Sequence, residues 1–179
     1  MSPVTITPVT SADLRAEPAR AAALLALNNA HASELSWLTP DAFAHLLDQA
    51  WRAWQIGAAD ALMIALDHDA AYDNPNHRWF RTRYDRFVYV DRIVVAPAAR
   101  GQGLARRLYE ELIREATAAG HDHLVCEVNL DPPNPQSDAF HAALGFAPLA
   151  TAGIHGGART SHCKTLHYKT VRYMARSLR

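Results

Sequence analysis

Residues 87–105 of the chain, FVYVDRIVVAPAARGQGLA, decide the fold. The first nine are rich in β-branched and aromatic side chains, which predicts a strand over 87–95. The segment RGQGLA follows at 100–105, and leucines then recur every four residues, the spacing of an amphipathic helix. The stretch therefore predicts a strand, a glycine turn and a helix in direct succession.

The glycine turn predicts a site for a phosphate-bearing ligand. Two glycines let the backbone approach a ligand closely, and the first N–H groups of the helix have no acceptor within the helix. Arg100 and Arg106 add positive charge. Arg106 also stands where the dinucleotide fingerprint has its third glycine, and no Lys-Ser/Thr pair forms a P-loop. These departures argue against nicotinamide and ATP as ligands.

The rest of the chain predicts an α/β (α+β) fold with a mixed, largely antiparallel central sheet of six to seven strands and helices on both faces. Residues 67–86 lack periodicity and predict a long polar connection. We expect one domain over 1–179. The expected strands are 4–7, 51–56, 61–66, 123–130, 146–150 and 166–175, and the expected helices are 18–32, one opening at Thr39–Asp41, and 137–144.

Composition narrows the functional classes. The chain has 179 residues, of which 49% are apolar and 20% charged, as in soluble globular proteins. No apolar run predicts a membrane span, the N-terminus shows no signal peptide, and two cysteines are too few for a disulfide scaffold, so we expect a cytoplasmic protein without membrane partners. The net charge of zero argues against nucleic acid as a general partner.

Two short segments carry metal-ligand residue types. They are Asp67-His68-Asp69 and His121-Asp122-His123. Neither has the spacing of a structural zinc site, so the sequence predicts no metal.

The stretch Val94–Ala105 resembles the central signature of the GNAT superfamily of acyl-CoA-dependent N-acetyltransferases, an Arg/Gln-x-x-Gly-x-Gly/Ala turn between a strand and a helix. Asn134, followed by Phe140 and the run Leu144-Gly145-Phe146, resembles the second signature of the same superfamily. The resemblance covers about residues 87–150 and is closest to a poorly characterised bacterial subgroup. It implies a GNAT-like fold, acetyl-CoA as cofactor, a small-molecule or protein amine as acceptor, and a homodimer.

The same resemblance implies which residues hold the cofactor. Backbone amides of the turn would take the pyrophosphate, and the strand before it would pair with the pantetheine arm. Asn134 would hold the arm from the other side, although an Asx turn between prolines explains it as well. The implied residues are Ile93, Val95, Arg100, Gly101, Gln102, Gly103, Leu104, Ala105, Arg106, Asn134 and Ser137.

For the chemistry, an amine must lose a proton and attack a thioester, and the departing thiolate needs a proton. Family members often supply that proton from a tyrosine, and His141 stands at that position here. Glu127 is the first candidate for the base, with Asp91 and Tyr89 as alternatives. By period-two counting, Asp91 and Tyr89 share a strand face with Ile93 and Val95. Each of these residues also has a purely structural interpretation.

The acceptor site in this family is usually built from the first two helices and the loop before the signature strand. Glu34 beside aromatic side chains would suit a cationic amine, although the aromatics also fit a core. Two alternatives to catalysis stay open: a non-catalytic acyl-CoA sensor on the same fold, and a nucleotide-binding regulator. The acceptor residues expected are His31, Glu34, Trp37, Tyr72, Asn76, Trp79, Phe80 and Tyr89.

Overall fold

A computed structural model describes residues 4–156 and 167–179. The chain forms two compact units. Unit 1 is Met1–Leu124 with Leu178–Arg179, and unit 2 is Val125–Ser177. Each unit is described by itself.

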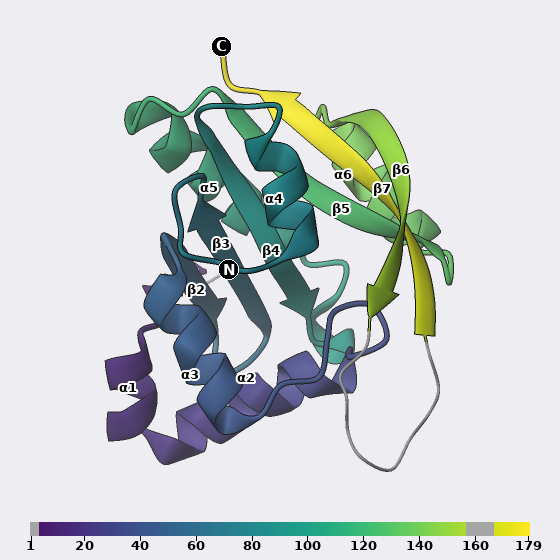
Figure 1. The fold of residues 1–179 in the computed structure, drawn as a ribbon. Coiled ribbons are helices and arrows are strands. Elements are labelled where there is room, and N and C mark those ends of the chain that lie inside the picture. The colour runs from purple at the N-terminus through teal and green to yellow at the C-terminus, as the bar shows by residue number, and fades with distance from the viewer. Residues whose placement is uncertain (1–3, 157–166) are drawn as a thin grey trace. The chain divides into compact units, whose positions relative to one another are not determined.

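Unit 1 is an antiparallel sheet covered by helices. Its strands lie in the order β1-β2-β3-β4, and each described pairing between neighbours is antiparallel. Helix α4 lies in front of these strands and α5 behind them (Figure 1). The strands are β1 (Ile6–Pro8), β2 (Arg52–Ile56), β3 (Ala61–Asp67) and β4 (Phe87–Val95); the helices are α1 (Ser11–Ala16), α2 (Pro18–Ala30), α3 (Pro40–Gln49), α4 (Pro75–Arg81) and α5 (Leu104–Ala118).

Strand β3 forms the centre of the core. Its first six residues, 61–66, have no exposed surface at all. A strand buried on both faces needs cover on both, and its sequence ALMIAL is accordingly apolar without alternation. Full burial of each large side chain stabilises the fold by roughly 1.5–3 kcal/mol. The prediction of helices on both faces is confirmed for this unit.

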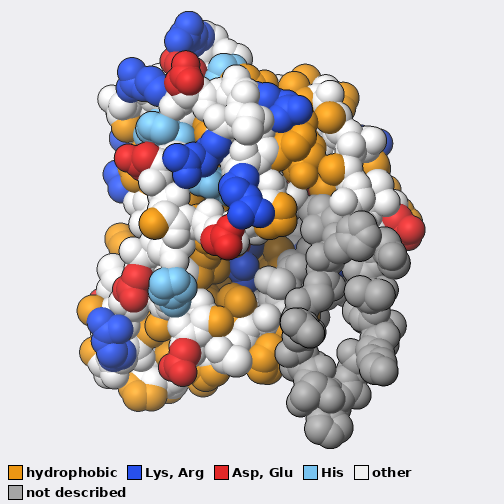
Figure 2. All heavy atoms as spheres, viewed as in Figure 1, with side chains coloured by type: hydrophobic (Ala, Val, Ile, Leu, Met, Phe, Trp, Pro, Cys, Tyr) orange, Lys and Arg blue, Asp and Glu red, His pale blue; other side chains and the backbone are white. Residues whose placement is uncertain are grey.

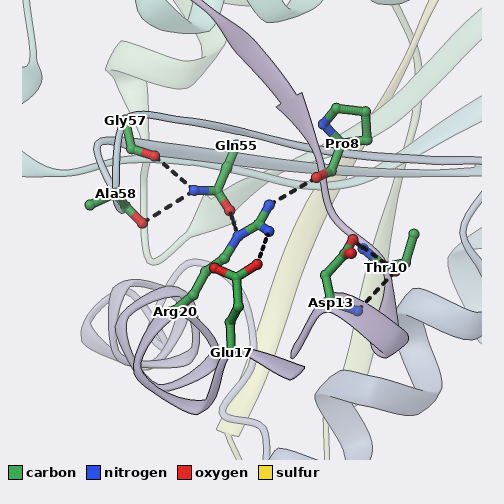
Figure 3. Close-up of polar contacts among 8 residues, drawn as sticks. All are labelled: Pro8, Thr10, Asp13, Glu17, Arg20, Gln55, Gly57 and Ala58. Atoms are coloured by element: carbon green, nitrogen blue, oxygen red, sulfur yellow. Dashed lines mark hydrogen bonds and ion pairs between the residues drawn. The ribbon is translucent and has the colours of Figure 1, made fainter. Parts of the chain in front are cut away.

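The guanidinium of Arg20 joins α2 to β1 and β2 (Figure 3). Its Nε donates to Oε1 of Gln55 at 2.6 Å, and its Nη2 donates to the carbonyl of Pro8 at 2.9 Å. The amide of Gln55 in turn donates to the carbonyl of Gly57 at 2.7 Å. One side chain thus fixes the start of α2 against the strands that it covers.

Unit 2 holds the remaining strands and one helix. They are β5 (His123–Asp131), α6 (Pro135–Ala143), β6 (Ala147–Gly156) and β7 (His167–Ser177), and β5 begins with the last two residues of unit 1. The strand order is β5-β7-β6, and β6 pairs antiparallel with β7. The predicted strand over 166–175 begins at residue 166, outside the described residues.

The predicted α/β class with six to seven largely antiparallel strands is confirmed: the described residues form seven. Two helices were missed. The sequence predicted a polar connection over 67–86, but Asn74 caps α4 through its side chain and Pro75 occupies the first turn. Only seven residues long, α4 is too short to show a helical period. The six-residue α1 was missed for the same reason, although Thr10 and Asp13 form a capping box there.

No helix among the described residues is long and apolar enough to cross a membrane. Figure 2 shows acidic and basic side chains interspersed on one face of the molecule.

Candidate functional site in unit 1

The turn between β4 and α5 presents an open backbone surface. Gly101 and Gly103 have φ angles of 76° and 74°, in the left-handed region that glycine adopts without strain. A Cβ built on either glycine meets no atom within 4 Å. Gly103 caps α5 without any side chain, so no side-chain cap covers the first N–H groups of this 15-residue helix. This arrangement fits a phosphate group.

Two arginines flank the turn. Arg100 and Arg106 are both exposed, and neither makes an ion pair with any residue that the structure describes. The Nε of Arg100 reaches the carbonyl of Val95 at 3.4 Å. Their charges therefore remain available to an anion at the turn.

Strand β4 contains a bulge at Asp91. Arg92 pairs with Ile64 and Val90 pairs with Ala65, which leaves Asp91 without an opposite residue on β3. The period-two count from Tyr89 to Ile93 therefore fails at this point. Beyond the bulge, Ile93 and Val95 are half-buried while Val94 is buried, so one face of the strand end is more open.

Asp91 is held in a buried network. Its Oδ1 accepts from the hydroxyl of Tyr72 at 2.5 Å, and its Oδ2 accepts from Nε of Arg92 at 2.7 Å. Arg92 also donates from Nη1 to Oδ1 of Asn28 at 2.6 Å. Burial and the neighbouring Asp91 raise the pKa of the Tyr72 hydroxyl well above its ordinary value, so it stays protonated and donates. Both oxygens of Asp91 are thus engaged.

A pocket of about 270 Å³ opens next to this network. Figure 2 shows the surface hollowed between the parts that Figure 1 labels α3 and α4. Of the predicted acceptor residues, only Tyr72 lines it. The lining residues are Ser36, Leu38, Ala42, His45, Leu46, Gln49, Ala71, Tyr72, Asp73 and Arg92. Two adjacent charged residues, Asp91 and Arg92, interrupt the otherwise apolar strand and are a sequence signal that could have indicated this pocket.

These features agree with the comparisons to known proteins. The profile of the Acetyltransferase (GNAT) family matches residues 35–146, which include the glycine turn. The chain belongs to the GNAT acetyltransferase family. No curated protein matches it in sequence.

Three solved structures show the same fold as this GNAT protein. An N-acetyltransferase from Staphylococcus aureus Mu50 has a TM-score of 0.67 at 19% identity, with 99% of this chain and 100% of that chain covered. The ribosomal-protein-S18-alanine N-acetyltransferase from Escherichia coli has a TM-score of 0.65 at 22% identity, with 98% of this chain and 94% of that chain covered. A phosphinothricin acetyltransferase from Sinorhizobium meliloti in complex with AcCoA has a TM-score of 0.62 at 20% identity, with 97% of this chain and 88% of that chain covered.

The GNAT family uses acetyl-CoA, and the turn of this chain fits it. The open glycines and the first amides of α5 suit the pyrophosphate, with Arg100 and Arg106 beside them.

The remaining acceptor residues expected for a GNAT site lie outside the pocket. Glu34 and Trp37 are exposed on the connection between α2 and α3, and His31 Nδ1 lies 3.8 Å from Oε2 of Glu34. Phe80 is fully buried beside Phe87 and Tyr89. Asn76 is buried on α4, and Tyr89 is buried on β4. The guanidinium carbon of Arg83 lies 3.5 Å from the ring centre of Trp79.

Unit 2 contains four residues that the sequence predicts for cofactor binding or catalysis: Glu127, Asn134, Ser137 and His141. Oδ1 of Asn134 accepts from the backbone N–H of Ser137, so Asn134 caps α6. His141 is 3% exposed, and its Nδ1 lies 2.8 Å from the carbonyl of Ser137. Burial lowers the pKa of His141, so the ring is neutral at neutral pH, with Nδ1–H as the donor to that carbonyl. Glu127 is half-buried on β5.

Proposed function

We propose that this protein is an N-acetyltransferase that transfers the acetyl group of acetyl-CoA to a primary amine by direct attack in a ternary complex. The open glycine turn at the start of α5 carries the proposal, because a Cβ on Gly101 or Gly103 would meet no atom within 4 Å and no side chain caps the first N–H groups of the helix. We further propose that residues 1–179 act as one domain in a cytoplasmic homodimer.

Acetyl-CoA supplies an activated acetyl thioester. In this proposal, the amides of Gln102 to Ala105 bind its pyrophosphate, and the backbone of Ile93 and Val95 pairs with its pantetheine arm. The N–H near Val95 stabilises the developing oxyanion, a role typically worth about 3–4 kcal/mol. The half-burial of Ile93 and Val95 supports this, since the face they share is the more open one.

We propose that the pocket beside Arg92 receives the acceptor. Its volume of about 270 Å³ suits a small-molecule amine or a single amino-terminal residue. Arg92 and Tyr72 at its wall are fixed by their bonds to Asp91, so the wall is preorganised. Because both oxygens of Asp91 are occupied, we assign it a positioning role and keep Glu127 as the proposed base.

The first experiment is a thermal-shift titration with acetyl-CoA, dephospho-CoA, ATP and NAD. Saturation at about 100 times Kd should stabilise the fold by roughly 2.7 kcal/mol, or about 5–10 °C. We expect acetyl-CoA to raise the Tm most, and an amine screen that detects free CoA thiol to show turnover. No shift with acetyl-CoA would contradict the proposal.

The same two measurements test the alternative of a non-catalytic acyl-CoA sensor. The observations that favour it are the occupied carboxylate of Asp91 and the buried, neutral ring of His141. A sensor would bind acetyl-CoA and release no thiol with any amine.

We propose His141 as the group that protonates the departing thiolate. Because Nδ1 keeps its proton for the carbonyl of Ser137, Nε2 takes up the proton that the attacking amine loses through Glu127 and then gives it to the sulfur. The change His141→Asn keeps an N–H that can reach the carbonyl of Ser137 but removes the imidazole. We expect acetyl-CoA affinity to stay within about threefold, while kcat falls about 10²- to 10⁴-fold. The control is His123→Asn, a half-buried histidine at the start of β5 that does not line the proposed acceptor pocket. Full activity in His141→Asn would remove His141 from the mechanism.

A further inference from the structure

Two segments that are far apart in sequence meet at one end of the β3–β4 pair. Asp67 ends β3, His68 follows it, and His121 lies between α5 and β5. Taken separately, neither segment has the spacing of a metal site. The fold brings one potential ligand atom of each residue within 4.8 Å of the other two.

The contacts among the three side chains converge on one carboxylate oxygen. Nε2 of His121 lies 3.0 Å from Oδ1 of Asp67, and Nδ1 of His68 lies 2.5 Å from the same atom. The close approach of His68 lacks the geometry of a hydrogen bond, since its Nδ1 is buried without a hydrogen-bond partner among the described residues. A lone pair facing a carboxylate oxygen at this distance is repulsive unless a cation or a proton lies between them.

The surroundings favour a bound cation over a solvated polar cluster. The side chain of His121 is 6% exposed, and the ring of Trp51 packs edge-on against it at 5.0 Å between centres. The side chains of Asp67 and His68 are 24% and 32% exposed, which leaves a route for an ion from solvent.

We propose that Asp67, His68 and His121 form a three-ligand site for a divalent transition-metal ion, with Zn²⁺ as the favoured ion. Two imidazole nitrogens and one carboxylate oxygen are ligands that Zn²⁺ binds at about 2.0–2.2 Å, and they disfavour Mg²⁺ and Ca²⁺, which take oxygen ligands. The side chains must open slightly from the present contacts to admit the ion. A fourth position stays open to water.

The site is separate from the glycine turn. Ala61 pairs with Val95 just before the turn, whereas Asp67 pairs with Val88 at the far end of the same strand pair. Six residues of strand separate the two, or roughly 20 Å. A bound ion would tie the end of β3 to the segment that follows α5. This inference does not rest on the proposed acetyltransfer.

The test uses the full chain after dialysis against a chelator, titrated with Zn²⁺, Mg²⁺ and Ca²⁺ and followed by thermal shift and calorimetry. We expect one Zn²⁺ per chain and a Tm increase of about 5–10 °C at 100 times Kd, with no response to Mg²⁺ or Ca²⁺. Co²⁺ should give the visible absorption bands of a tetrahedral site.

The variants decide whether these three residues bind the ion. His68→Gln changes a partly exposed side chain and is expected to fold. It should lower Zn²⁺ affinity by more than the roughly 10- to 100-fold that loss of an outer-shell partner costs. His121→Gln should do the same, and His45→Gln is the matched control because it removes an exposed histidine elsewhere. The proposal is overturned if wild type shows no Zn²⁺ response, or if His68→Gln and His121→Gln bind Zn²⁺ as wild type does.

Discussion

Gly103→Asp should abolish most of the affinity for acetyl-CoA while leaving the fold intact. Gly103 has a positive φ that Asp and Asn tolerate better than other side chains, and a Cβ there meets no atom within 4 Å. The new carboxylate would stand at the N-terminus of α5, where it caps the helix but repels a pyrophosphate. We expect a loss of about 3 kcal/mol, or about 100-fold in Kd, measured by calorimetry with acetyl-CoA.

Gly103→Asn is the matched control for this experiment. It has nearly the same size and the same tolerance of the backbone angle, but it carries no charge. We expect its Kd to rise less than about tenfold. Equal affinities for the two variants would mean that the turn does not bind an anion, and the cofactor assignment at this position would fail.

Arg92→Met should destabilise the protein by about 3–5 kcal/mol, because it leaves the carboxylate of Asp91 buried without its cation. The side chains of Asp91 and Arg92 are only 4% and 5% exposed. The expected drop in Tm is about 10 °C in a thermal melt without ligand. Chemical denaturation measures the free energy of unfolding directly.

Two further variants make this result specific. Asp91→Asn combined with Arg92→Met removes both charges and should recover part of the lost stability. Arg114→Met removes an exposed arginine that pairs with Glu111 on the surface of α5, and should cost about 1 kcal/mol or less. A loss in Arg92→Met no larger than that in Arg114→Met would show that the buried pair contributes little.

The strand, turn and helix around the glycines could be predicted from the sequence because each has a strong local signal. A nine-residue segment with five β-branched side chains, two glycines and a four-residue leucine repeat agree with one another. Helix α4 could not be predicted in this way. Its one fully buried apolar side chain, Phe80, gives no repeat, and its start depends on the cap formed by Asn74.

The site residues also divide into those with a local sequence signal and those that only the fold brings together. The turn is local, so its residues could be named from the sequence. The pocket is assembled from segments as far apart as Ser36 and Arg92, and only the fold brings them together. The bulge at Asp91 is also invisible to a period-two count, because it depends on which residue of β3 lies opposite.

That bulge makes β4 sensitive to chain length as well as to side-chain chemistry. Asp91 is the extra residue of β4 that has no opposite residue on β3. A deletion at position 91 would leave Val90 opposite Ala65 and Arg92 opposite Ile64, with every remaining side chain on its present face. It would remove the local bend of the bulge and the carboxylate that holds Tyr72 and Arg92. Homologous chains that share this pocket should therefore keep a residue at this position, and that residue should be acidic.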